Sequence, residues 1–373
     1  MDHSTNPAAL VAWGGGILGF IFGAVANRTN FCTMGSVSDV VNMGSWGRMR
    51  LWLLAIAVAM LGAQALYAAG VVDLGKSIYT QPNFRWLSYI LGGFLFGVGM
   101  TLGSGCGSKT LVRLGGGSLK SLVVFVFFGV AAYATLKGLF AVWRTRAIDV
   151  VAVDLSQHGL AHQDLPTVVA SATGIAPAVA AIAVTAALAL ALLAFVFKDR
   201  EFRASADHVL GGLVIGLTIV GGWYVTGHLG FGEDPNTLET VYFGTNSRTI
   251  ESLSYTAPVG YTIELLMLWT DASLRVSFGI AAVIGIVLGS FAYAIASRTF
   301  RFEGFAGAED TVSHVAGGVL MGFGGVTALG CTIGQGLTGL STLALGSMLA
   351  FAAIVAGSAL TMKWQYWRIT REA

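Results

Sequence analysis

Charged residues are scarce in this sequence: aspartate, glutamate, lysine and arginine make up 11% of its 373 residues, whereas 55% are hydrophobic. A soluble domain usually carries about 25% charged residues, and a water-soluble protein this apolar would need a core larger than its surface allows. A lipid bilayer removes that conflict, because outward-facing side chains can then be apolar as well. The composition therefore excludes an ordinary soluble protein and predicts an integral membrane protein.

Cysteine is scarce too, since only Cys32, Cys106 and Cys331 occur and no CxxC pair is present. An odd number of distant cysteines argues against a disulfide framework and against a zinc site. The net charge of +2, without a basic stripe, gives no reason to expect nucleic acid binding. The segment GSGCGSKT lacks the spacing of a phosphate-binding loop. We therefore expect no ATP hydrolysis, no enzymatic activity, no cofactor and no metal.

Long apolar runs make up much of this sequence. Nine runs are long enough to cross a hydrocarbon core about 30 Å thick. They are 10–26, 51–72, 86–105, 119–141, 174–197, 208–226, 276–297, 312–329 and 342–361. The apolar run 255–269 carries Pro258 and Glu264, and we interpret it as a buried, partly inserted helix instead of a tenth span. The sequence thus predicts an all-α membrane protein with about nine transmembrane helices.

Lysine and arginine are distributed unevenly over the loops between these runs. With nine spans, fourteen of these residues fall on one side of the membrane and six on the other. Because positive residues collect in cytoplasmic loops, we expect the C-terminus in the cytoplasm and the N-terminus outside.

Two segments resemble each other at an offset of 225 residues. Residues 92–106 read GGFLFGVGMTLGSGC and residues 317–331 read GGVLMGFGGVTALGC. We expect a first half at 1–145, a linker with one transmembrane helix at 146–205, and a second half at 206–373. Four spans and one linker span precede the second half, so that half is predicted to insert upside down. Inverted repeats of this kind are a common transporter architecture.

Each cysteine lies between an apolar run and small polar residues. The segments are NRTNFCTMGS around Cys32, GSGCGSKTL around Cys106 and LGCTIGQGLTG around Cys331. Such glycine-rich stretches predict broken or re-entrant helices, which a membrane tolerates only where they are buried in protein or line a wet cavity. A helix that restarts after a break directs its N–H groups toward that break, and those groups favour an anion.

A thiol adds a weak donor and a polarizable sulfur, which suit a soft, sulfur-containing anion. The alternative is a purely structural role in packing, because free cysteine is among the most buried residue types. Cys106 and Cys331 occupy equivalent positions in the repeat, which favours a function for this pair, whereas composition decides nothing for Cys32. The residues that we predict to line a substrate path are Cys32, Thr33, Ser104, Gly105, Cys106, Ser108, Lys109, Gly330, Cys331, Thr332 and Gln335.

Four charged residues near the apolar runs have candidate roles. Lys109 could draw anions toward a cytoplasmic mouth, and Lys137 lies near a span end, where we expect its ammonium group to extend to the interface. Glu264 and Asp39 are candidate proton or cation couplers, because acids inside a membrane are often functional.

These features resemble the YeeE/YedE family of sulfur-transport membrane proteins. The resemblance rests on the three cysteine segments, on the two related halves and on the stretch GLVIGLTIVGGWYVTG that ends at Gly227. It implies inverted halves in a bacterial inner membrane around an hourglass-shaped path. Thiosulfate would pass the three cysteines through transient S–H hydrogen bonds, without a stable covalent intermediate. The resemblance also implies a small cytoplasmic partner, a sulfurtransferase of the TusA type.

Three alternatives stay open at this point. The substrate could be another sulfur or selenium species, such as sulfite or sulfide. The chain could be a membrane thiol oxidoreductase, which would need two cysteines that form a disulfide. It could also be a passive pore for a different solute, with the cysteines as packing.

Overall fold

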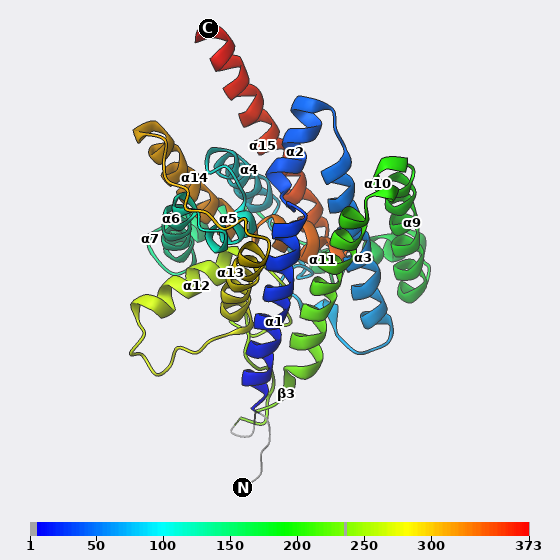
Figure 1. Cartoon of the computed structure of the whole chain (residues 1–373). Coiled ribbons are helices and arrows are strands. Elements are labelled where there is room, and N and C mark those ends of the chain that lie inside the picture. The colour runs from blue at the N-terminus through cyan, green and yellow to red at the C-terminus, as the bar shows by residue number, and fades with distance from the viewer. Residues whose placement is uncertain (1–5, 235–236, 373) are drawn as a thin grey trace.

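Helices form nearly all of the regular structure in the computed structural model, which describes residues 6–234 and 237–372 (Figure 1). The longer helices are α1 (Pro7–Arg28), α2 (Thr33–Met43), α3 (Gly47–Ala68), α4 (Trp86–Leu102), α5 (Gly107–Gly115), α6 (Leu119–Leu136), α8 (Leu165–Thr173), α9 (Pro177–Phe197), α11 (Ala206–Tyr224), α12 (Thr256–Met267), α13 (Phe278–Ala296), α14 (Ala308–Thr327) and α15 (Leu345–Glu372). The shorter ones are η1 (Leu74–Lys76), α7 (Leu139–Trp143), η2 (Arg144–Ile148), η3 (Leu155–His158), α10 (Arg200–Ala204), η4 (Val225–Leu229) and η5 (Gly334–Gly339). Two short antiparallel pairs, β1 (Asn83–Phe84) with β2 (Val153–Asp154) and β3 (Phe231–Glu233) with β4 (Thr240–Tyr242), complete the described chain.

Eight helical segments of the described chain are long and apolar enough to cross a membrane, which confirms a multi-pass protein. They are Pro7–Met43, Gly47–Ala68, Trp86–Gly115, Leu119–Leu136, Pro177–Phe197, Ala206–Leu229, Phe278–Ala296 and Leu345–Arg371. The remaining predicted span, 312–329, corresponds to α14, which is helical over 20 residues but carries Glu309, Asp310 and His314 in its first two turns. These polar residues lower the mean hydropathy of α14, so that it is not among the eight membrane-spanning candidates.

The run 255–269 forms the short helix α12, which has 12 residues. At a rise of about 1.5 Å per residue it is about 18 Å long, too short to cross a hydrocarbon core of about 30 Å. Its buried side chains include Val259, Ile263 and Glu264. The structure therefore agrees with the interpretation of this run as a buried helix instead of a further span.

Glycines hold α4 and α14 together in an antiparallel pair. A Cβ atom on Gly92 would lie 2.7 Å from the carbonyl oxygen of Gly324, and one on Gly324 would lie 2.6 Å from that of Gly92. The same reciprocal approach joins Gly99 and Gly317, at 2.8 and 2.7 Å. Only glycine allows two helix backbones to come this close. The contacts are crosswise with respect to the sequence offset of 225 residues, which relates Gly92 to Gly317 and Gly99 to Gly324.

Other helix pairs also join the two predicted halves. In one set α1 packs along α13, where Gly15 faces Phe278 and Gly23 faces Ile286. In the corresponding set α11 packs along α3. Likewise α4 packs along α15, and α14 packs along α6. Each predicted half therefore packs mainly through contacts with the other half.

The two ends of the described chain mark two opposite faces (Figure 1). One face carries the start of α1 with β3 and β4, and we name it the N-terminal face. The other carries the end of α15 and α10, and we name it the C-terminal face. Figure 1 shows α5 in the interior, where it contacts α1, α6 and α13.

Candidate functional site

Three helices end in the same way just before the three cysteines. The residue two places before each cysteine has a positive φ angle: Asn30 at 51°, Ser104 at 56° and Leu329 at 59°. The next residue in each segment donates its N–H to a carbonyl five positions back, as in the bond of 2.8 Å from Gly105 to Met100. The other two such bonds run from Phe31 to Ala26 and from Gly330 to Gly325. A left-handed residue followed by this bond is the Schellman helix ending, so the predicted helix breaks are confirmed.

Each cysteine then begins a new helical segment. Cys32 is the N-cap of α2, and its Sγ accepts the N–H of Gly35 at 3.4 Å. Cys331 begins the segment that contains η5, and its Sγ accepts the N–H of Gly334 at 3.4 Å. Cys106 is the N-cap of α5 and interacts with the N–H of Lys109. Each thiol thus sits at the positive end of a helix dipole, where its sulfur faces unpaired N–H groups.

The three breaks meet in the interior. The side chains of Cys32 and Cys106 are near enough to interact, and Cys106 Sγ also lies 3.3 Å from Ser108 Oγ and beside Thr332. Thr332, the residue after Cys331, brings the third break to the same cluster. All three thiols are buried and none forms a disulfide. Cys32, which had no repeat partner in the sequence, therefore belongs to the same cluster and shares the same local geometry.

Several buried polar atoms around this cluster have no hydrogen-bond partner among the described residues. They include Oγ1 of Thr33, Oγ1 of Thr332 and Oε1 of Gln335. An unpaired buried polar atom costs about 1–3 kcal/mol. Because the two threonine hydroxyls can each donate a hydrogen bond, a small anion between the breaks would relieve part of this cost.

The remaining predicted residues support the breaks. Lys109 lies one turn into α5, and its Nζ donates to Asn30 Oδ1 at 3.3 Å, which ties the first break to the second. The carbonyl of Ser104 accepts a bond of 3.1 Å from Arg113. Gly105 and Gly330 lie directly before Cys106 and Cys331, the two cysteines at equivalent positions of the repeat, and Gly330 packs on Gln335. All eleven predicted residues lie at the three breaks or in the first turns of the helical segments that follow them.

A cavity of about 200 Å³ reaches Gly330 and the Cys331 break, and we name it the vestibule. Its lining includes Tyr79, Ser247, Glu251, Ser254, Thr256 and Tyr261. The N–H of Tyr255, next to this lining, donates to Cys331 Sγ at 3.4 Å. The loop that carries Ser247 begins at Gly244, which packs on Ala8 near the start of α1, so the vestibule lies toward the N-terminal face. Sequence reasoning missed these residues, although the hydroxyl-rich stretch ESLSYT was a visible signal.

The two acids considered as couplers each have a cationic partner. Asp39 accepts two hydrogen bonds from Arg48. Glu264 accepts a bond of 3.1 Å from Lys137 and one of 2.6 Å from Tyr133. Lys137 therefore pairs with Glu264, in addition to the expected extension of its half-exposed ammonium group toward the interface. Both acids serve as structural ion pairs in this conformation.

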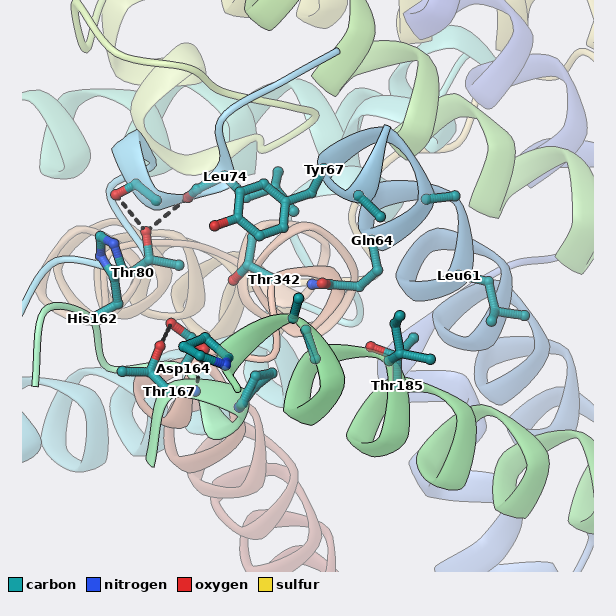
Figure 2. Close-up of a pocket in the computed structure, with 18 of the residues that line it drawn as sticks. Leu61, Gln64, Tyr67, Leu74, Thr80, His162, Asp164, Thr167, Thr185 and Thr342 are labelled. Carbon is teal, nitrogen blue, oxygen red and sulfur yellow. Dashed lines mark hydrogen bonds between the residues drawn. The ribbon is translucent and has the colours of Figure 1, made fainter. Parts of the chain in front are cut away.

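A second cavity, of about 620 Å³, lies between α3, α8 and α9 (Figure 2). Several of its polar side chains already have local partners. Thr80 donates to the Leu74 carbonyl at 2.8 Å, and Asp164 accepts from Thr167 Oγ1 at 2.9 Å (Figure 2). None of the three cysteines is among its lining residues. We assign this lateral cavity no part in the cysteine path.

Known proteins resemble this chain over most of its length. A family model described as sulphur transport matches residues 28–360. The thiosulfate transporter TsuA of Spirochaeta thermophila is 27% identical over 361 residues, which cover 95% of this chain and 99% of that protein. The thiosulfate transporter TsuA of Escherichia coli is 28% identical over 338 residues, which cover 86% of this chain and 85% of that protein. The family match extends over far more than half of the chain, and the chain therefore belongs to the sulphur-transport family, YeeE/YedE.

Proposed function

We propose that this protein takes up thiosulfate, or a closely related small sulfur-containing anion, across a bacterial inner membrane. Two relatives that align with most of the chain are named thiosulfate transporters. The observation that carries the proposal is the meeting of three broken helices whose N-caps are all cysteines. Membership in a transport family also favours transport over enzymatic turnover.

The chemistry of the cluster suits such an anion. Three helix N-termini offer N–H groups and the positive ends of their dipoles, which stabilise negative charge. Thr33 and Thr332 add hydroxyl donors that have no nitrogen or oxygen partner among the described residues. Each neutral thiol can donate a weak S–H hydrogen bond and presents a polarizable sulfur to the sulfur of the substrate. The anion would pass from one thiol to the next without a covalent bond to any of them.

We place the path between two inverted halves, residues 1–145 and 206–373, with 146–205 as the linker. The reciprocal contacts of Gly92 with Gly324 and of Gly99 with Gly317 support this arrangement. A two-fold axis in the membrane plane would relate each contact to the other. Transporters with inverted repeats hold their substrates near the midplane, where the repeats meet.

We place the N-terminal face outside the cell and the C-terminal face in the cytoplasm. Arg48, Arg50, Arg200 and Arg203 support this orientation, because they lie at the helix ends near α10 on the C-terminal face. A small sulfurtransferase of the TusA type, which would take up the imported sulfur, would then dock on the C-terminal face. The selenium analogues and other sulfur anions remain the alternative substrates.

One observation favours a second candidate function, a thiol oxidoreductase. The sequence separation of Cys32 and Cys106 argued against a disulfide, yet their side chains interact directly. In that function the two thiols would cycle between free and disulfide-bonded forms during turnover. Alkylation of free thiols before and after turnover, read on a gel, separates the two functions.

Growth on a single sulfur source tests the proposed transport. A bacterium that lacks its own thiosulfate uptake would express this chain and receive thiosulfate as its only sulfur source. Growth that requires the chain is the expected result. Absence of growth, with the protein in the membrane and a TusA-type partner supplied, would contradict thiosulfate as the substrate.

A further inference from the structure

A carboxyl group lies in the vestibule, next to the position from which an anion would reach Cys331. Glu251 belongs to the loop before α12 and shares the cavity with Tyr79, Ser254 and Tyr261. Its backbone is fixed to η4, since Thr226 Oγ1 donates to the Glu251 carbonyl at 2.5 Å and accepts its N–H at 3.2 Å. The position of this carboxyl group is therefore set by the fold.

The groups around Glu251 offer it no positive charge. Its Oε2 accepts a bond of 2.7 Å from Ser247 Oγ. The titratable groups that interact with it from other elements are the phenols of Tyr79, on the segment after η1, and Tyr261, on α12. No lysine or arginine in the described ranges forms an ion pair with it, and Arg248 in the same loop is exposed. Glu251 thus differs from Asp39 and Glu264, which both have a cation.

A carboxylate at this point conflicts with the passage of an anion. Two like charges in a cavity of about 200 Å³ repel each other far more than they would in open water. A neutral carboxyl group removes the repulsion and also becomes a hydrogen-bond donor to the anion. Burial raises the pKa of Glu251 to about 7, although the bond from Ser247 acts in the opposite direction. The group can therefore exchange its proton near neutral pH.

We infer that Glu251 is the site at which a proton from the outer medium joins the anion in the vestibule. The neutral carboxyl group admits the anion and donates a hydrogen bond to it, and the carboxylate excludes it. Uptake is then fastest in acidic medium and falls as the external pH rises through the pKa of Glu251. This inference rests on the proposed function and adds a proton-dependent entry step to it.

The test is the initial rate of labelled thiosulfate uptake into cells at external pH from about 6 to about 8. Thiosulfate keeps both of its charges over this range, so the substrate itself does not titrate. A single group with a pKa of about 7 is about tenfold less protonated at about pH 8 than at about pH 6. The wild-type rate should fall by about the same factor. The variants are Glu251→Gln, Ser247→Ala and, as the matched control, Glu239→Gln, an exposed acid directly before β4.

Each outcome decides the inference. We expect Glu251→Gln to transport at a rate that no longer depends on pH, because its amide stays neutral. Ser247→Ala should shift the midpoint to higher pH, since it removes the bond that stabilises the carboxylate, and Glu239→Gln should follow the wild type.

A flat wild-type profile, or a Glu251→Gln variant with the wild-type profile, would overturn the proton site while leaving transport intact. If Glu251→Gln does not reach the membrane, an unshifted Ser247→Ala midpoint overturns it. No uptake by wild type at any pH would overturn the proposed function and this inference together.

Discussion

The side chain of Cys32 is near enough to that of Cys106 for the two thiols to interact, although the two residues belong to different helix breaks. Both cysteines occupy the N-cap position of a short helix, and both are buried. An anion that passes one of them therefore meets the other. This contact joins the first cysteine segment to the repeated pair.

Mild oxidation should link these two thiols and stop transport. A disulfide between Cys32 and Cys106 would remove both S–H donors and tie α2 to α5. Uptake should fall after oxidation and recover after reduction, and Cys32→Ser should protect against the loss. When the protein is not treated with oxidant, alkylation during uptake should label three free thiols per chain. A disulfide that forms and disappears with turnover would instead support the oxidoreductase.

The hydroxyl group of Thr332 should matter for transport more than its volume does. Its Oγ1 is buried beside the Cys106 thiol and has no nitrogen or oxygen partner among the described residues. A hydrogen bond to a charged group contributes about 1.5–3 kcal/mol, so Thr332→Val should slow uptake by about 10- to 100-fold. Thr332→Ser keeps the hydroxyl and should retain most of the rate. Equal rates for the valine variant and the wild type would show that the anion does not use this group.

Adding one methyl group at the α4–α14 contact should destabilise the fold. A Cβ on Gly324 would lie 2.5 Å from the backbone nitrogen of Phe96. Overpacking of this kind costs about 1–3 kcal/mol, and we expect Gly324→Ala to lower the thermal unfolding temperature in detergent. Gly304→Ala is the control, because nothing lies within 4 Å of its added Cβ. Unchanged melting of Gly324→Ala would argue against close helix contact there.

The ion pair of Lys137 with Glu264 should contribute to stability and not to transport. Lys137→Met leaves the Glu264 carboxylate buried with only Tyr133 as a partner. We expect a loss of about 1–3 kcal/mol, less than for a fully buried pair, because Lys137 is half-exposed. The double variant Lys137→Met with Glu264→Gln should recover part of the unfolding temperature. A large loss of uptake in a stably folded double variant would instead support a role for Glu264 in proton or cation coupling.

The sequence was sufficient to predict the helical membrane class and the three helix breaks. Both depend on local composition: long apolar runs for the spans, and glycine with small polar residues for the breaks. The offset related Gly92 to Gly317 and Gly99 to Gly324, whereas the packing that the structure shows is crosswise, Gly92 against Gly324 and Gly99 against Gly317. Patterns over short stretches carry this information because helix periodicity and turn chemistry are local.

The place of Cys32 and the vestibule could not be predicted in this way. Cys32 joins Cys106 through the packing of α1, α2 and α5, which depends on contacts between distant segments. The vestibule combines the loop before α12 with Tyr79 and Gly330, which no spacing rule connects. For the same reason the cations that pair with Asp39 and Glu264 appear only in the folded chain.

The most direct test of the central claim is uptake of labelled thiosulfate by the purified protein in liposomes. The wild type would be compared with Cys32→Ala, Cys106→Ala and Cys331→Ala. Ser358→Ala, a buried serine bonded to Thr101, provides the control. The account predicts uptake by the wild type and the control, and a loss of at least about tenfold in each cysteine variant that stays folded. Uptake at the wild-type rate by all three cysteine variants would contradict it.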